Sequence, residues 1–123
     1  KLAKEYNINY IRLVNEPFNF GVGKVRRKLP LLYLRWLSKL AANKIKQAKL
    51  SSNDLFIGFV NAGNLTKSYL EYANHIARQY PQATVELGCH PGFANETLSK
   101  TYAHWGDYHW QQELELLKNY QHG

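Results

Sequence analysis

The sequence predicts an α/β fold in which parallel strands alternate with helices. Three observations support this. Short apolar segments rich in β-branched and aromatic residues are separated by longer segments with helical periodicity. Strands spaced by helices of this length form right-handed parallel βαβ units. The chain of 123 residues, with 45% hydrophobic and 20% charged residues, has the size and composition of one globular domain. We therefore expect residues 1–123 to form a single α/β segment.

Each element has its own signal. Asn7 follows an apparent helix end, a position where a left-handed residue is common. Pro30 suits the first turn of a helix, and Pro81 closes one. The predicted strands are residues 8–14, 55–60 and 85–88. The predicted helices are residues 2–6, 30–50, 65–80 (inner side Tyr69, Tyr72, Ala73, Ile76 and Tyr80) and 110–120, and a long loop is expected from Pro91 past Gly106.

The positive charge is concentrated in the first part of the chain. Residues 1–50 contain 12 Lys/Arg and 2 Asp/Glu, and residues 51–123 contain 4 and 7, so the two parts carry +10 and −3. The basic segment 24–28 suits nucleic acid or anionic lipid. A solvated helix face is favoured, because no aromatic-rich binding motif is interleaved with it.

The predicted helix 30–50 is amphipathic. Its apolar stripe steps by three or four residues and comprises Leu34, Leu37, Ala41, Ile45 and Ala48. Lysines lie mostly off the stripe, so a helix packed on the protein with a basic, solvated side is favoured over a membrane-surface helix.

The sequence also bears on where in the cell the protein is located. Cys89 is the single cysteine, so no internal disulfide forms and a reducing, cytoplasmic location is predicted. No run approaches the ~18 apolar residues of a membrane span. The chain contains no methionine, and we expect it to be a piece of a longer protein.

Polar residues follow each predicted strand, at 15–16, 61–64 and 90–92. In parallel sheets the carboxyl ends of the strands meet at one edge, where ligands bind. His90 is the leading candidate there. A histidine held at a strand end, with Pro91 and Gly92 fixing the departing backbone, suits a general acid or a metal ligand. A hydrogen-bonded structural histidine is the alternative.

Glu86 and Arg12 are the nearest charged candidates. Glu86 lies four residues before His90, so both side chains are expected on one face of the strand. Its carboxylate could orient the imidazole, bind substrate, or pair with a cation such as Arg12. Arg12 interrupts an apolar strand and needs a partner, which could equally be a substrate or a structural glutamate.

The other nucleophile and ligand candidates are weaker. Cys89 is expected on the opposite face from His90, as a small core residue. The remaining histidines, at 75, 104, 109 and 122, have no recognised metal-ligand spacing. No nucleophile elbow, P-loop or dinucleotide-binding motif is present.

Three segments in this order resemble the C-terminal half of the YdjC-like carbohydrate deacetylases, including the branch associated with hopanoid lipid biosynthesis. They are residues 2–17 (LAKEYNINYIRLVNEP), 53–66 (NDLFIGFVNAGNLT) and 85–93 (VELGCHPGF), with WQQELELL at 110–117 behind them. Gln112 or a neighbour takes the place of an arginine in the family's trailing helix. The family's Asp-Asp element and its metal-binding histidines have no match.

The resemblance implies part of a (β/α) TIM-like barrel from an enzyme that removes acetyl groups from N-acetyl amino sugars or glycolipids. A divalent metal, Zn or Mg, would activate the water in the complete enzyme. His90 would be the acid or an orienting residue near the leaving amine. Arg12, Glu86, Asn61 and Gly92 would contact the substrate or support residues that do.

The resemblance also implies that the metal ligands lie outside this chain. We therefore expect the chain alone to bind no metal and to be inactive. Its open sheet edges would pair with the missing half or with a second copy.

Two other function classes stay open. One is a basic α/β module that binds nucleic acid or anionic lipid without catalysis, of which nucleic acid is disfavoured. The other is a structural domain in which Arg12 and Glu86 only pair with each other.

Overall fold

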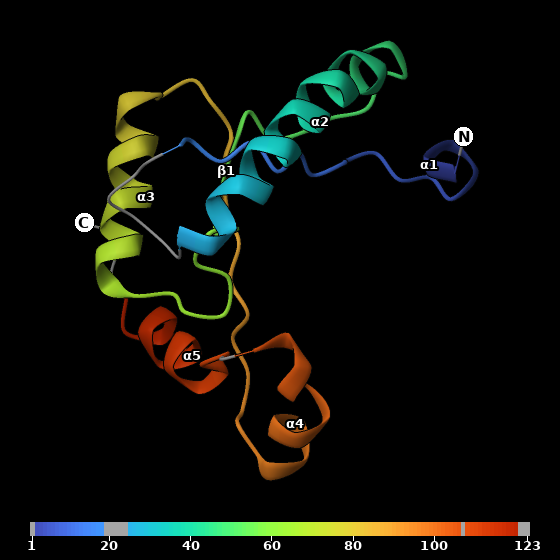
Figure 1. The fold of residues 1–123 in the computed structure, drawn as a ribbon. Coiled ribbons are helices and arrows are strands. Elements are labelled where there is room, and N and C mark those ends of the chain that lie inside the picture. The colour runs from blue at the N-terminus through green and yellow to red at the C-terminus, as the bar shows by residue number, and fades with distance from the viewer. Residues whose placement is uncertain (1, 19–24, 107, 121–123) are drawn as a thin grey trace.

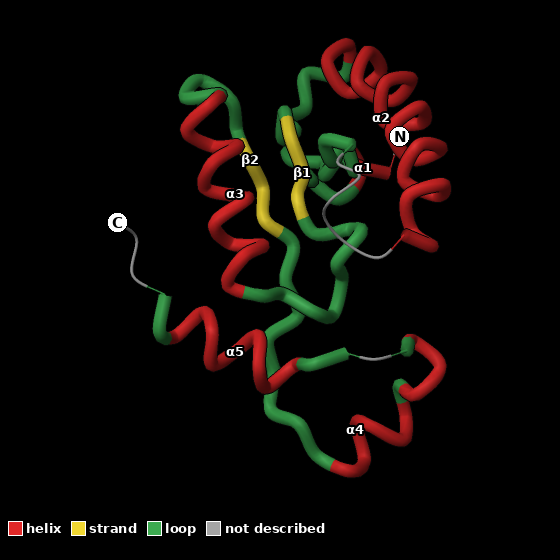
Figure 2. The backbone as a smooth tube through the Cα atoms, turned by 60° about the vertical axis from the view of Figure 1, so that its left-hand side comes forward, coloured by secondary structure: helices red, strands yellow, loops and turns green. Residues whose placement is uncertain are grey.

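The computed structural model describes residues 2–18, 25–106 and 108–120, and its architecture is α/β. Strands β1 (Leu55–Ile57) and β2 (Val85–Leu87) are parallel, with Leu55 opposite Val85 and Ile57 opposite Leu87. The sheet within the described ranges has two strands. Figure 2 shows it between helices α3 and α2. The predicted fold class is confirmed, whereas the barrel stays a prediction.

The long helices lie close to their predicted positions, and a short one was missed. The helices are α1 (Leu2–Glu5), α2 (Lys28–Gln47), α3 (Lys67–Gln79), α4 (Glu96–Thr101) and α5 (Trp110–Lys118), with short 3₁₀ helices η1 (Val25–Arg27) and η2 (Ala103–Trp105). Asn7 has φ of 53°, as predicted. Residues 91–109, predicted as a loop, contain α4. Asn95 caps it, because its side-chain oxygen accepts from the Leu98 N–H at 2.8 Å.

Residues 8–14 do not form the predicted strand, although this segment runs beside β1. Its only bridge within the described residues joins Tyr10 to Ser51. Further along, the Asn53 side chain replaces the sheet ladder. Its oxygen accepts from the Leu13 N–H and its amide donates to the Leu13 carbonyl, both at 2.8 Å. A side chain therefore makes the pairing that a backbone would make in a continuous strand.

Strand β1 is shorter than the predicted 55–60 because the backbone turns at Gly58. This glycine has φ of +132°, and a Cβ there would lie 2.5 Å from the Gly88 carbonyl oxygen. Only glycine fits such a conformation and such a close approach. The chain therefore leaves the sheet before Phe59.

Two predicted helix faces need correction. On α2, the buried side is centred on Leu31, Ser38 and Ile45, and Leu37 is exposed. Ser38 can be buried because its hydroxyl donates to the Val14 carbonyl at 3.2 Å. On α3, Tyr80 is exposed instead of facing inward, since the helix ends at Gln79 and the chain turns outward there.

One apolar cluster joins β1, α2 and α3. Half-buried residues of β2 and α5, such as Leu87 and Leu117, pack against it. Its buried members are Leu31, Ile57, Val60, Leu65, Tyr69, Leu70, Ala73 and Ile76. This cluster fixes how the two strands meet their helices.

Both strands point their carboxyl ends toward α5. Figures 1 and 2 show α5 below α3, with α4 on an excursion beyond it. The N–H of Gly92 donates to the Trp110 carbonyl at 3.1 Å, and the N–H of His109 donates to the Gly63 carbonyl at 2.7 Å. The start of α5 is thus tied to the loops that leave both strands.

Truncating Leu31 should destabilise the protein far more than truncating its neighbour on the opposite side of α2. Leu31 is 1% exposed and Leu29 is 77% exposed. We expect Leu31→Ala to lower the free energy of unfolding by about 2–5 kcal/mol through lost burial and the cavity left behind. Leu29→Ala should stay within about 0.5 kcal/mol of the parent. Urea unfolding followed by circular dichroism measures both, and equal losses would contradict the packing of α2.

Candidate functional site

The exits of the parallel strands are held by two buried carboxylates. The first is Glu16, which is 1% exposed. Its Oε2 accepts from the N–H groups of Phe59 and Val60 at 2.8 and 3.1 Å. These two N–H groups lie just past the end of β1. Glu16 therefore satisfies backbone donors that the sheet no longer pairs.

Tyr69 of α3 completes the Glu16 site. Its hydroxyl donates to Oε1 of the same carboxylate. Burial raises the pKa of Tyr69 well above its ordinary value of 10.0, and the hydrogen bond to Glu16 raises it further. Tyr69 is thus a protonated donor at neutral pH, and the carboxylate has three donors around it.

The second carboxylate is Glu113, on α5 and also 1% exposed. Its Oε1 accepts from the Leu65 N–H at 2.9 Å, and its Oε2 accepts from the His90 N–H at 2.5 Å. One side chain thereby joins the start of α3, the exit of β2 and α5. These two hydrogen bonds to one buried side chain position the His90 backbone.

The His90 side chain lies half-buried at this rim. Its Nδ1 is buried and has no hydrogen-bond partner among the described residues. The ring meets Tyr108 edge to face, with centroids 5.1 Å apart and planes at 82°. A Cβ at Gly63, whose φ is +79°, would lie 2.5 Å from the Tyr108 ring, so this glycine makes room for the ring beside His90. Unpaired buried polar atoms are uncommon in proteins and often mark a functional position.

Glu86 and Arg12 lie together. Neither forms a hydrogen bond with the His90 imidazole among the contacts of the described residues. Arg12 Nε and Nη2 both lie 2.5 Å from Glu86 Oε1. The Tyr10 hydroxyl donates to Glu86 Oε2 at 2.8 Å. The Arg12 guanidinium also lies over the Phe56 ring, 5.3 Å from its centroid. Glu86 therefore pairs with Arg12, which was one of the interpretations left open.

This charged pair remains accessible to solvent. The Arg12 side chain is 57% exposed and that of Glu86 is 21% exposed. Exposed pairs contribute little to stability, because water screens them and side-chain entropy opposes them. Their hydrogen-bonding groups are therefore available to a polar ligand at small cost.

The two remaining predicted positions are part of the loops themselves. Asn61 is half-buried, and its side-chain amide donates to the Asn64 carbonyl within its own loop. Gly92 is anchored to the start of α5 through its N–H. Arg27, from the basic segment, donates to the carbonyls of Phe59 and Ala62 at 3.2 and 3.1 Å. That arginine supports the β1 exit loop.

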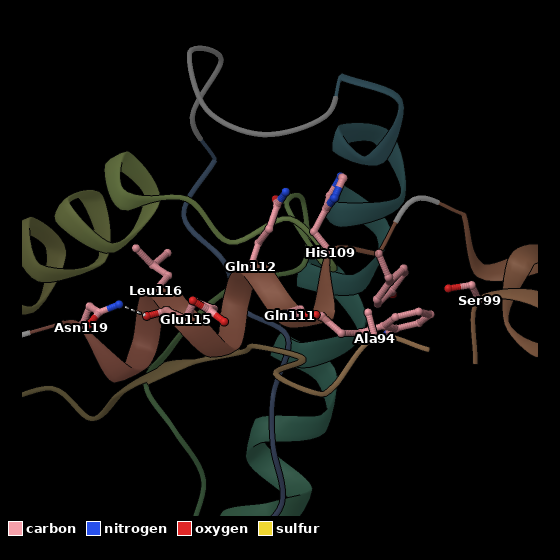
Figure 3. A pocket seen from close by; sticks show the side chains of 10 residues that line it. Ala94, Ser99, His109, Gln111, Gln112, Glu115, Leu116 and Asn119 are labelled. Atoms are coloured by element: carbon pink, nitrogen blue, oxygen red, sulfur yellow. Dashed lines mark hydrogen bonds between the residues drawn. The ribbon is translucent and has the colours of Figure 1, made fainter. Parts of the chain in front are cut away.

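A groove of about 750 Å³ lies beside the start of α5. Figure 3 shows Gln112 and His109 projecting from one side of α5, and Ser99 facing it from α4. Tyr108 lines the groove and also contacts His90, so the groove adjoins the rim. Its lining residues are Ala94, Ser99, Tyr108, His109, Trp110, Gln111, Gln112, Glu115, Leu116 and Asn119.

Cys89 is part of the packing around the core and not of a nucleophilic site. It is half-buried and packs against the apolar cluster. Burial raises the pKa of its thiol, and the Glu113 carboxylate acts in the same direction. A thiol that resists ionisation is a poor nucleophile, in agreement with its predicted core position.

Metal-ligating side chains do not converge in the described ranges. No group of three or more His, Cys, Asp or Glu side chains there is arranged to hold a metal ion. The residues present therefore do not by themselves fit the divalent cation that the family resemblance implies.

Sequence reasoning placed Glu16 among the polar residues at the strand exits without giving it a role, and it did not single out Glu113. Both had a signal. Glu16 follows Asn15 at the end of an apolar segment and precedes Pro17. Glu113 shares a helical stripe with Trp110, Leu117 and Tyr120, and a carboxylate on an apolar stripe requires buried donors. The strand exits were predicted to gather at one edge, and these contacts show how they do.

The fold and the rim define an α/β protein with its candidate site at the carboxyl ends of parallel strands. Residues 1–121 match the family described as YdjC-like protein, and the chain belongs to that family. Membership suggests a function related to carbohydrate deacetylation. The chain matches none of the curated proteins and none of the solved structures with which it was compared. In the described part of the chain, no helix is long and apolar enough to span a bilayer.

Neutralising Glu113 should loosen the rim. In Glu113→Gln the amide group replaces one accepting oxygen, so one of the two backbone N–H groups loses its acceptor. We expect a loss of about 1–3 kcal/mol in the free energy of unfolding and faster amide exchange at His90 and Leu65. Glu115→Gln, on the exposed side of the same helix, is the matched control and should change neither. Unaltered exchange at His90 in Glu113→Gln would contradict the assignment.

Tyr69 should make the protein lose stability in alkali. The unfolded tyrosine releases its proton near pH 10, whereas the folded one retains it because its pKa is raised. The contribution is therefore complete below pH 10 and is lost as the pH rises, at about 1.4 kcal/mol per pH unit. Tyr69→Phe should remove this share of the slope between about pH 10 and 11. Urea unfolding across that range, with exposed Tyr80→Phe as control, measures it. Parallel slopes for Tyr69→Phe and the parent would rule it out.

Proposed function

We propose that this protein contributes the carboxyl-end rim of a carbohydrate deacetylase that hydrolyses the acetamide of an N-acetyl amino sugar or glycolipid. The observation that carries the proposal is His90. In a chain of the YdjC-like family, it stands at a strand exit, with a buried Nδ1 that has no hydrogen-bond partner in the described part of the chain and a backbone held by Glu113.

His90 would supply a proton or orient the leaving group. Amide hydrolysis adds water to the carbonyl carbon and then breaks the C–N bond, and the departing nitrogen must gain a proton. An imidazole can donate such a proton from a ring nitrogen to an atom within hydrogen-bond reach. The fixed backbone limits the positions that the ring can take, which is what proton transfer to one atom requires.

Arg12 and Glu86 would contact the sugar. Their paired, partly exposed groups, together with the Tyr10 hydroxyl, form a row of donors and acceptors that suits the hydroxyls of a saccharide. Asn61 and Gly92 would shape the loops around it. These roles explain why a charged pair of little structural value lies beside the rim.

The divalent metal belongs to the proposal for the complete enzyme only. When bound, such an ion polarises the carbonyl and activates water. The described residues do not gather three ligands, so we assign this chain proton transfer and substrate contacts alone. We also propose that the sheet is part of a (β/α) barrel. Further strands would pair along the outer side of residues 9–15 and of β2.

Replacing His90 tests the proposal. In the full-length protein, His90→Ala should lower the rate of acetate release from an N-acetyl amino sugar by about 10²–10⁴-fold, the usual contribution of a general acid. KM and bound metal should change little, because the ring acts on the leaving group. Colorimetric acetate release and elemental analysis measure these quantities.

His75→Ala is the control, since His75 is exposed on α3 and away from the rim. It should retain parental turnover. If His90→Ala keeps full activity, His90 is a structural residue. If His90→Ala loses bound metal together with activity, His90 is a metal ligand, and the proposal that it acts only on the leaving group is wrong.

A further inference from the structure

Helix α2 has a second apolar side that the fold does not use. Leu29, Tyr33, Trp36 and Leu40 step by four, three and four residues, so they form one stripe. At 100° per residue this stripe lies opposite Leu31, Ser38 and Ile45, which face the protein. All four side chains are exposed, Leu29 by 77% and Trp36 by 55%. Tyr33 and Trp36 stack on each other, with ring centroids 6.0 Å apart. We call these four residues the outer stripe.

The surroundings of the outer stripe are wholly basic. Residues 17–53 contain nine Lys/Arg and no Asp or Glu. Lys39, Lys44 and Lys46 on α2 are exposed. Tryptophan and tyrosine favour the boundary between water and lipid, and lysines beside an apolar stripe reach anionic headgroups. This is the composition of a helix that lies in the plane of a membrane surface.

The rest of an α/β sheet would not cover the outer stripe. Strands added to either edge of the sheet would lie on the buried side of α2, because the sheet packs against Leu31 and its neighbours. Figure 2 shows α2 flanking the strands with one side turned away from them. Further strands of the sheet would therefore leave the stripe exposed to an external partner.

The positive charge beside the outer stripe indicates which kind of partner would cover it. A second copy of this chain would bring its own basic α2 against the first, and like charges facing each other disfavour association. A nucleic acid would satisfy the lysines but would leave exposed leucines without a role, since backbone recognition uses polar and charged groups. An anionic bilayer satisfies both parts, because it accepts the apolar side chains and attracts the lysines.

We propose that the outer stripe of α2 docks the protein on anionic membrane surfaces. The leucines and Trp36 insert at the level of the headgroups, and the flanking lysines bind the negative charge. The helix lies on the bilayer and does not cross it. This surface is separate from the rim at the strand ends, so the inference stands whether or not the proposed deacetylase function holds.

Vesicle flotation of the full-length protein tests the proposal. The probes are vesicles of phosphatidylcholine alone and of phosphatidylcholine with about 30% phosphatidylglycerol. We expect the partition coefficient to be about tenfold or more higher on the anionic vesicles, and to fall at about 0.5 M salt as the charges are screened. Trp36→Ser combined with Leu40→Ser should lower it by about tenfold or more.

The matched control is Phe93→Ser. Phe93 is 74% exposed but lies near α4, away from α2, so this variant should bind vesicles like the parent. Lys39→Glu should weaken binding to the anionic vesicles while leaving the thermal melt unchanged. Brominated lipid should also quench tryptophan fluorescence less in Trp36→Phe than in the parent. This second readout uses a milder variant in case the double variant folds poorly.

Several results would overturn the proposal. Equal or absent binding to both vesicle types would do so, as would loss of binding in Phe93→Ser. Concentration-dependent dimers in light scattering that vanish in Trp36→Ser, without vesicle binding, would assign the stripe to a second copy. Retention of DNA that depends on Trp36 and exceeds vesicle binding would assign it to nucleic acid. Hydrolysis of a soluble substrate should be unchanged in all these variants, which separates this test from that of His90.

Discussion

Backbone N–H groups that leave a parallel sheet need new acceptors, and in this protein two buried carboxylates provide them. Glu16 takes the donors beyond β1 and the hydroxyl of Tyr69, and Glu113 takes the donors of Leu65 and His90. A carboxyl group so deeply buried is tolerated only when its oxygens have hydrogen-bond partners. The rim therefore forms as a connected unit, since removing one donor leaves a buried oxygen without a partner.

This constraint explains the division between structural and chemical residues at the rim. The two buried carboxylates accept hydrogen bonds from backbone N–H groups, so they hold the loops in place. His90 is held by its backbone N–H, while its side chain meets Tyr108 edge to face and its Nδ1 has no hydrogen-bond partner among the described residues. The Arg12–Glu86 pair is joined by hydrogen bonds and is partly exposed. A ligand would thus contact side chains that contribute little to stability, and these side chains are held by buried residues on which the stability of the rim depends.

Helix α2 shows a similar division along its two sides. Its narrow inner side, centred on Leu31, joins the core cluster, and its hydroxyl-bearing Ser38 is satisfied by the backbone. The outer stripe contributes nothing to the described fold, yet it carries the largest exposed side chains of the helix. The expected basic side is exposed at Lys39, Lys44 and Lys46, but the first turns of the helix also expose an apolar stripe. The lysines lie beside an apolar stripe, and this arrangement is what makes a membrane surface its natural occupant.

The sequence by itself determined the α/β class, the positions of α2, α3 and α5, and the gathering of polar residues at the strand ends. Periodicity and turn residues encode these locally, within one element. Tertiary structure alone decided which partner each polar group takes. Asn53 replaces a strand partner for Leu13, and Glu113 reaches His90 across 23 residues. Glu86 turns to Arg12 across 74 residues. Such pairings depend on distances between elements, which no local pattern specifies. They are the reason why residues 8–14 do not form the predicted strand and why Glu86 pairs with Arg12.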